Sequence, residues 1–359
     1  MTGRTSTSIL ERLLLFYMIQ TPYCTLPAIF FKKNCTTPPD AIQLHGRKGI
    51  DEVRMPFGGE DAGMRQAMII SNPSSGKEEA QQYVSQVQEI LESQQYEVVV
   101  NETAGEGDAT NYCLSACKDG CDLVISIGGD GTLHETINGM MDQEHRPRLG
   151  VVPLGTVNDF ARALNISLDP EEAIRQLRSE QIHRVDLGKI NDRLFANVVA
   201  AGSLAEALFS VSSEEKSKLG SFAYLKEGLK DLMNTPAKPL TIEYDGQFWE
   251  GESPLFLAAL TNSVGGFEKF SPEAAVDDGL IHCFVIRSMN VFNTVTLGTS
   301  LLFGNLKNHK DVDYFMAKEV HVRSTEAIHT NVDGEEGPSL PIQISVLPQH
   351  IDVIVPEEV

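Results

Sequence analysis

The spacing of apolar residues along the chain changes near residue 185. Between Arg65 and Arg184, short unbroken apolar runs alternate with segments in which apolar residues recur every three or four positions. Unbroken runs are typical of buried strands, and the longer period is typical of helices that pack on one side. The strands are predicted at 67–70, 96–100, 123–127 and 149–154, with helices between them. This alternation predicts an α/β domain with a doubly wound parallel sheet.

Beyond Val185 the apolar runs become shorter and alternate with polar residues. Such runs are typical of antiparallel strands, so a β-rich, sandwich-like second domain is predicted over 186–346. Its strands are expected at 194–200, 240–244, 254–261, 280–286, 319–323 and 342–346, with helical segments at 222–233 and 289–306. The final run, 351–355, is suited to return to the first domain, which would then comprise 65–185 and 347–359.

Residues 1–64 share neither pattern. Thr-, Pro- and Gly-rich pieces surround one isolated apolar cluster at 13–19. We expect a disordered leader here. Two alternatives stay open: an upstream extension with Met64 as the true start, or a small regulatory or membrane-touching arm that uses residues 13–17.

Polar, glycine-containing loops follow three of the predicted parallel strands, at 71–76, 128–131 and 155–159. Ligands of doubly wound sheets bind at the carboxyl ends of the strands, where all three loops are expected. Glycines let a phosphate approach the backbone, and the amides at a helix N-terminus attract an anion. Asp130 would repel a bare phosphate unless a divalent cation bridges the two. We therefore expect a nucleotide–magnesium site, the alternative being a tight turn with a capping aspartate.

The composition of the chain excludes some classes of binding partner. The 359 residues carry a formal net charge of −21, which argues against nucleic acid as a partner and against broad adhesion to an anionic membrane. No apolar run is long enough to cross a bilayer. The six cysteines form no Cys-x-x-Cys pair. Cys113, Cys117 and Cys121 are expected to be core residues in a reducing cytosol rather than metal ligands.

Four motifs follow one another along the chain: Asn-Pro-Ser-Ser-Gly-Lys, Gly-Gly-Asp-Gly-Thr-Leu, Pro-Leu-Gly-Thr-Val-Asn-Asp-Phe-Ala-Arg and Val-Asp-Gly-Glu. None fits the P-loop or the Gly-x-Gly-x-x-Gly pattern. Together, from Arg65 to the C-terminus, they resemble the diacylglycerol kinase catalytic-domain family and its soluble bacterial members. The resemblance implies a two-domain enzyme with its active site in the inter-domain cleft, which uses ATP and Mg²⁺ to convert diacylglycerol to phosphatidic acid. His134 is a departure, because the family usually has Asn there.

The resemblance also implies roles for individual residues. Asp130 and Asp159 would order Mg²⁺ and its waters, and Asp186 would belong to the same active-site network, unless it merely caps a turn. Glu335 would be the catalytic base, with Glu336 as its rival. The nucleotide would be bound by loop residues and two threonines, namely Asn72, Pro73, Ser74, Ser75, Gly76, Thr103, Gly128, Gly129, Asp130, Gly131, Thr132, Leu133, His134 and Thr156.

A separate acidic turn precedes the strand expected at 280–286. Paired aspartates followed by glycine can surround a hard cation with side-chain and backbone oxygens. The resemblance implies a structural magnesium bound by the carbonyls of Ala275 and Leu280 and the carboxylate of Asp278. A plain turn at the start of a strand is the simpler interpretation.

The implied substrate stays in the bilayer, so we expect a cytoplasmic protein in peripheral contact with the inner face of the membrane. Segments 219–226 and 301–310 combine apolar residues with lysines, as interfacial contacts do, although core-facing helices explain them equally well. A homodimer is compatible with the sequence. A kinase for another lipid alcohol, such as phosphatidylglycerol or a sphingoid base, and an enzyme like NAD kinase stay open. A non-enzymatic regulator would be expected to lack the four acidic residues.

Overall fold

The computed structural model describes residues 64–75, 80–203, 205, 236–266, 270–271, 273–287, 296–297, 299–301 and 303–357. All of them belong to one compact unit, Gly59–Val359. The leader predicted over 1–64 and the helix predicted at 222–233 lie outside the described residues, apart from Met64.

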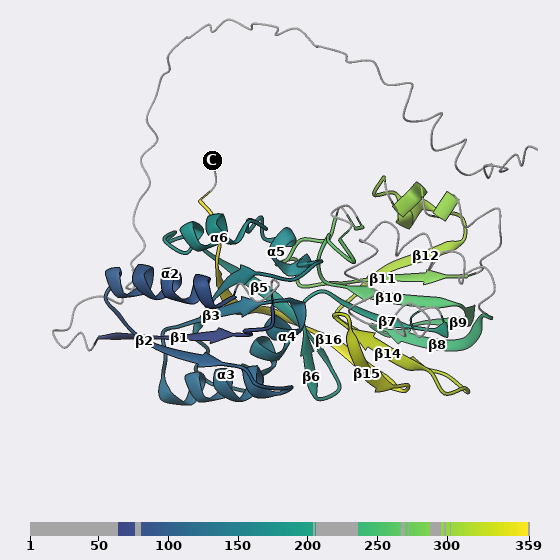
Figure 1. Ribbon diagram of the computed structural model, residues 1–359. Helices are drawn as coiled ribbons and strands as arrows, with labels where there is room; N and C mark the ends of the chain where they lie inside the picture. Colours follow the sequence, from purple (N-terminus) through teal and green to yellow (C-terminus); the bar gives the residue numbers. More distant parts are fainter. Residues whose placement is uncertain are drawn as a thin grey trace, which may run out of the picture. The chain divides into compact units, whose positions relative to one another are not determined.

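Four parallel strands form the first part of the larger sheet (Figure 1). They are β1 (Arg65–Ser71), β2 (Tyr96–Glu102), β3 (Leu123–Gly128) and β4 (Arg148–Pro153), in the spatial order β2-β1-β3-β4. The unbroken apolar runs had predicted all four. Because β1 lies between β2 and β3, the chain order reverses beside it, and the loops after β1 and β3 leave the sheet as neighbours.

Helices cover both faces of these strands. Helices α2 (Ala80–Ser93) and α6 (Pro170–Gln176) pack on one face, while α3 (Asp108–Asp119), α4 (Asp130–Asn138) and α5 (Asp159–Ala163) pack on the other. The two-residue period of β1 accounts for the separation, because Ala67 and Ile69 join the first cluster whereas Met68 and Ile70 join the second. The predicted doubly wound architecture is confirmed.

The second part of the chain forms an antiparallel six-stranded sheet. Its spatial order is β12-β11-β10-β7-β14-β15, from β7 (Val198–Ala201), β10 (Leu255–Ala259), β11 (Ile281–Ile286), β12 (Val312–Ala317), β14 (His329–Val332) and β15 (Glu335–Ser339). The remaining strands extend the parallel sheet to ten, and are β5 (Ile182–Ile190), β6 (Arg193–Phe195), β8 (Lys238–Tyr244), β9 (Gln247–Ser253), β13 (Glu319–Arg323) and β16 (Ile342–Ile354). Buried side chains of both sheets share one core, as in a β-sandwich.

Strand β16 belongs to both halves of the ten-stranded sheet. Its start pairs antiparallel with β13, through Val322 and Ile342, and its end pairs parallel with β4, through Val353 and Leu149. Strand β5 pairs antiparallel with β16 over residues 344–354, and the register is irregular between Leu347 and Ile351.

The helix predicted at 289–306 is described only in part. Residues 296–297 and 299–301 are helical, the chain turns at Phe303 and Gly304, and a short 3-10 helix, η2 (Leu306–Asn308), follows. Among the described residues, no helix has the length and apolar character needed to cross a membrane.

Candidate active site

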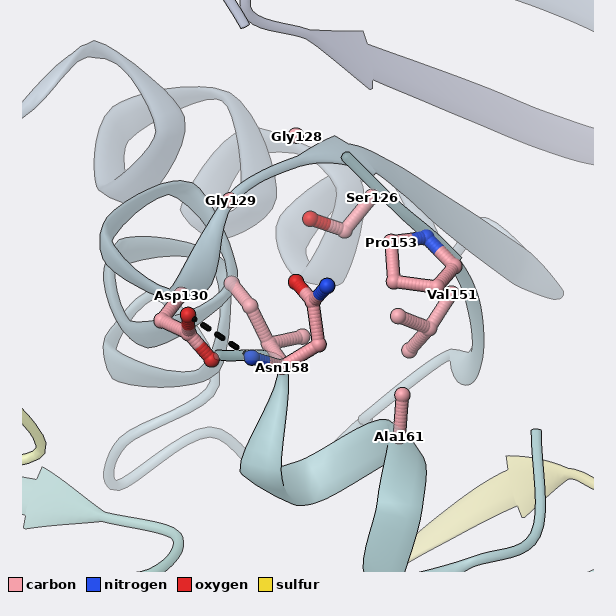
Figure 2. Close-up of a pocket in the computed structure, with 9 residues that line it drawn as sticks. Ser126, Gly128, Gly129, Asp130, Val151, Pro153, Asn158 and Ala161 are labelled. Atoms are coloured by element: carbon pink, nitrogen blue, oxygen red, sulfur yellow. Dashed lines mark hydrogen bonds between the residues drawn. The ribbon is translucent and has the colours of Figure 1, made fainter. Parts of the chain in front are cut away.

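The loops after β3 and β4 touch each other above the sheet. The Leu154 amide donates to the Gly128 carbonyl at 2.7 Å, and the Asn158 amide donates to Asp130 Oδ2 at 3.0 Å (Figure 2). A Cβ atom on Gly155 would lie 2.6 Å from Asn158 Oδ1 and 3.0 Å from the Gly129 Cα. The close contact therefore requires glycine at position 155, as expected where two backbones meet.

The loop after β1 joins this pair through its asparagine. The Asn72 amide donates to the Ile127 carbonyl at 3.0 Å, and Asn72 Nδ2 donates to Thr132 Oγ1 at 3.3 Å. Ser74 donates to Asn72 Oδ1 through its amide at 3.1 Å and its hydroxyl at 2.7 Å. The structure thus brings together two of the motifs, although Gly76 lies outside the described residues.

Several of the predicted nucleotide-binding residues lie at the edge of this loop cluster. The Thr103 amide donates to the Ser71 carbonyl at 2.8 Å, which holds the end of β2 beside the first loop. Pro73, Ser74 and Thr156 are exposed at the open side of the loops. These residues stay predictions as ligand contacts.

A small cavity lies beneath the loops (Figure 2). Ser126, Asp130 and Asn158 provide its polar lining, and its volume of about 10 Å³ is that of a single water molecule. A nucleotide is far larger than this volume. It would have to lie on the open side of the loops.

Asp130 is held at a site that disfavours its charge. Burial raises the pKa of this carboxyl, and the neighbouring charges of Asp159 and Asp333 raise it further, while the hydrogen bond from the Asn158 amide lowers it. Asp130 also begins α4, where the helix dipole favours a negative charge. A carboxylate in such surroundings gains from a bound cation.

Asp159 has a different environment, supplied by a loop that the sequence did not indicate. Asp159 Oδ1 accepts from Ser263 Oγ at 2.7 Å and from the Gly266 amide at 2.9 Å, and Oδ2 accepts from the Gly265 amide at 2.5 Å. Burial raises the pKa of Asp159, and these three hydrogen bonds oppose that shift. The only signal in the sequence was the Gly-Gly pair soon after the run 254–261.

The predicted base lies at the tip of the β14–β15 hairpin. Asp333 and Gly334 have φ angles of 52° and 96°, as required of both central residues in a type I′ turn. This turn places Glu335 Oε1 3.1 Å from the position that a Cβ atom would take on Gly131. The carboxylate therefore lies over the first turn of α4. Because neighbouring strand residues face opposite ways, the side chain of Glu336 points away from this position.

Asp333 fastens the hairpin to the rest of the molecule. It accepts hydrogen bonds from the amides of Ala196, Asn197 and Val198 at 2.7–2.9 Å, and its Oδ2 lies 3.2 Å from His134 Nδ1. Both ring nitrogens of His134 have protein partners, and its side chain is buried. Any contact of His134 with a nucleotide would therefore involve its backbone.

Asp186 contacts the acidic turn before β11. Its Oδ2 accepts from the Gly279 amide and its Oδ1 from the Gln349 amide, both at 2.6 Å, and its own amide donates to the Val276 carbonyl at 2.8 Å. These contacts join the turn to β16. They do not include Asp130 or Glu335, so a role in the active-site network stays a prediction.

Asp278 closes the same turn. It accepts from the Ala275 amide at 3.1 Å and the Leu280 amide at 2.9 Å, and its Oδ2 lies 2.9 Å from His282 Nε2. Although burial acts to raise the pKa of Asp278, these bonds bring it below its ordinary value. One acceptor position of the carboxylate is left, so a cation bound here would depend on backbone carbonyls.

No side-chain cluster in the described part of the chain could hold a metal ion alone, since no suitable group of three His, Cys, Asp or Glu occurs there. A cation beside Asp130 would need phosphate oxygens or water as its other ligands. Cys113 and Cys117, on α3, and Cys121, just after it, are buried in the core, as predicted.

Comparison with known proteins covers both halves of the chain. A model of the diacylglycerol kinase catalytic domain matches residues 66–190. A model described as the YegS C-terminal NAD kinase beta sandwich-like domain matches residues 197–355.

Relatives of known name match along nearly their whole length. A diacylglycerol kinase of Bacillus subtilis (strain 168) is 38% identical over 299 residues, which cover 82% of this chain and 98% of the relative. One of Staphylococcus haemolyticus (strain JCSC1435) is 40% identical over 293 residues, covering 82% and 89%. A solved structure of a diacylglycerol kinase from Bacillus anthracis str. Sterne superimposes with a TM-score of 0.70 at 30% identity, covering 81% and 97%. On these matches, the chain belongs to the diacylglycerol kinase family and is a lipid kinase.

Proposed function

We propose that this enzyme transfers the γ-phosphoryl group of ATP to the free hydroxyl of diacylglycerol and releases phosphatidic acid and ADP. One observation carries the proposal: the Glu335 carboxylate lies over the first turn of α4, beside Gly131. A proton acceptor and the amides of a helix N-terminus thus face the same space. Phosphoryl transfer needs this combination of alignment, charge stabilisation and a base near the acceptor.

Glu335 would accept the proton of the lipid hydroxyl while the new bond from oxygen to phosphorus forms and the bond between the β- and γ-phosphates breaks. Its exposure leaves room for an acceptor to approach. The hairpin turn and the contacts of Asp333 hold the carboxylate in place. Glu336 faces the other way and would take no part.

The loops after β1, β3 and β4 would bind the triphosphate on their open side. The raised pKa of Asp130, caused first by burial, supports a role in attracting a divalent cation there. Magnesium, when bound, neutralises phosphate charge and orients the transferred group. Asp159 would act mainly through its position, since three donors already occupy its carboxylate.

The proposal is tested with an acceptor screen. Purified enzyme, labelled ATP and Mg²⁺ are incubated with mixed micelles that contain diacylglycerol, phosphatidylglycerol or sphingosine, and with soluble NAD in a further reaction. We expect labelled phosphatidic acid as the main product. Label in another lipid would identify a different acceptor, label in NAD would place the enzyme with NAD kinases, and no labelled product would reject the proposal.

Glu335→Gln tests the base, and Glu336→Gln is its matched control. General base catalysis typically contributes about 10²–10⁴-fold, so kcat should fall by that factor in the first variant and by less than about twofold in the second. The KM for ATP should stay the same in both. Equal losses in the two variants, or near-normal turnover by a folded Glu335→Gln enzyme, would remove Glu335 from this role.

A further inference from the structure

The side chain of His134 lies at the centre of a buried polar network. Only 4% of its surface is exposed, and its two ring nitrogens contact residues from three different elements. Nδ1 lies 3.2 Å from Asp333 Oδ2 in the hairpin turn. Nε2 lies 2.9 Å from Arg193 Nε in β6 and 3.2 Å from Asn138 Nδ2, one turn further along α4.

These contacts determine where the imidazole proton is. Arginine can only donate, so Nε2 must accept from Arg193 and carries no hydrogen. Asn138 Nδ2 also lies near Nε2, but its two hydrogens have nearer acceptors in the His134 carbonyl at 2.9 Å and the Leu194 carbonyl at 3.1 Å. The imidazole hydrogen is therefore on Nδ1, which donates to the Asp333 carboxylate.

Arg193 extends the network to the far side of the hairpin. Its Nη1 donates to the Glu336 carbonyl at 2.8 Å while its Nε donates to His134. Glu335 lies between two fixed points as a result. Asp333, two residues before it, is bound by His134 and three backbone amides, and Glu336, directly after it, is bound by Arg193.

We propose that His134 and Arg193 form a bridge that positions Glu335 over the first turn of α4. The inference depends on the proposed function, in which Glu335 is the base. Neither bridge residue touches the reacting atoms, and both act through the hairpin. A base that moves by about 1 Å can lose about a hundredfold in rate, so a modest loosening of the hairpin would reduce turnover.

Two substitutions at position 134 separate the two bonds of the ring. In Asn, Nδ2 is as many bonds from Cα as Nδ1 is in His, so His134→Asn keeps the donor to Asp333 and loses the acceptor for Arg193. In Gln, Oε1 is as many bonds from Cα as Nε2 is in His, so His134→Gln keeps that acceptor. Arg193→Met removes the bridge from the other side, and Arg175→Met, an exposed arginine on α6, is the matched control.

The experiment measures kcat and KM of the full chain with the lipid acceptor found in the screen. His134→Asn and Arg193→Met should each lower kcat about tenfold without changing the KM for ATP. The double variant should be no slower than either single variant, because one bridge cannot be lost twice. His134→Gln should keep most of the activity, and Arg175→Met should keep all of it.

Hydrogen exchange of β15 supplies a readout that needs no activity. Its amides should exchange faster in His134→Asn and Arg193→Met, and close to the wild-type rate in His134→Gln. The proposal would be overturned if the double variant lost the product of the two single losses in kcat. It would also be overturned if the single variants changed only the KM for ATP, or if β15 exchanged faster while kcat stayed normal. An inactive wild-type enzyme would instead reject the proposed function, while the exchange rates would still decide whether the bridge holds the hairpin.

Discussion

Asp130 and Asp159, which both follow glycine-containing loops, differ in the hydrogen bonds that their carboxylates accept. Asp130 has one backbone donor and two acidic neighbours, whereas Asp159 has three donors from the 263–266 loop. The sequence placed both at helix N-termini, and the structure agrees. The hydrogen-bond partners of Asp159 could not be predicted from the sequence, since Gly265 is 106 residues away along the chain.

Asparagine at these two positions should have opposite effects on stability. Asp130→Asn keeps an acceptor for the Asn158 amide and removes a disfavoured charge, so the Tm of the nucleotide-free protein at neutral pH should rise. Asp159→Asn replaces one carboxylate oxygen by an NH2 group, which cannot accept a hydrogen bond. A buried donor is then left unpaired, which costs about 1–3 kcal/mol, so the Tm of this variant should fall. Calorimetry with EDTA present measures both, and each variant should lose more than about a hundredfold in kcat.

The pH dependence of the same Tm tests the raised pKa of Asp130. A carboxyl whose pKa is higher in the folded than in the unfolded state stabilises the fold at low pH, and that contribution is lost as the pH rises through the folded-state pKa. Wild type should therefore lose this contribution on going from acidic to neutral pH. Asp130→Asn should lose less over the same range, and parallel curves for the two proteins would contradict the assignment.

Asn331 has a buried donor without a protein partner. Its side chain is 3% exposed, its Oδ1 accepts from the Gly334 amide at 2.9 Å, and its Nδ2 is unpaired. Asn331 pairs with Glu336 across the hairpin, so its side chain lies on the face away from Glu335. The unpaired buried donor costs about 1–3 kcal/mol of stability.

At the scale of elements, strongly patterned segments could be predicted and weakly patterned ones could not. The parallel strands β1, β3 and β4 are mostly apolar and buried, and Asp-Gly marked the β14–β15 turn. Strands β5, β9 and β12 were not predicted, and the exposed and half-buried residues of β9 and β12 follow no clear alternation. Helix α4 begins at Asp130, so Gly131 lies in its first turn, although glycine weakens a helical pattern.

The acidic turn before β11 gives a prediction about metal binding. If the carbonyls of Ala275 and Leu280 join Asp278 around a cation, millimolar Mg²⁺ should raise the Tm of the nucleotide-free protein relative to EDTA. Asp278→Asn should abolish that difference. Asp277→Asn, which alters the neighbouring carboxylate beside His183, should preserve it. A Mg²⁺ effect of the same size in all three proteins would place the cation elsewhere.

At the scale of the molecule, a net charge of −21 leaves apolar contact as the main attraction to a bilayer. Phe303 is 74% exposed at a turn, in the same segment as Lys307, which pairs with Glu273. Burial of such a side chain in the interface contributes about 2 kcal/mol. Phe303→Ala should weaken binding to zwitterionic vesicles containing diacylglycerol by about thirtyfold in a flotation assay. Phe248→Ala, whose aromatic ring is 58% exposed on β9, is the control and should bind normally.

The two-part plan of the molecule could be predicted because the period of the apolar residues changes between its parts. The pairing of strands across the two parts could not, since a single strand of alternating residues does not reveal its neighbours. Strand β16 is the main case. Its residues suggested two separate short strands, whereas the structure has one that runs from β13 to β4.

That continuous strand constrains how the protein is made. The sheet beneath the loops that we propose to bind phosphate has an open edge at β4 until residues 342–354 have left the ribosome. A chain that stops earlier would expose the backbone groups of β4 and the apolar residues that β16 covers, which invites aggregation. Deletion of residues 342–354 should therefore disable nucleotide binding, and chaperones would have to protect the nascent domain until this strand has been made.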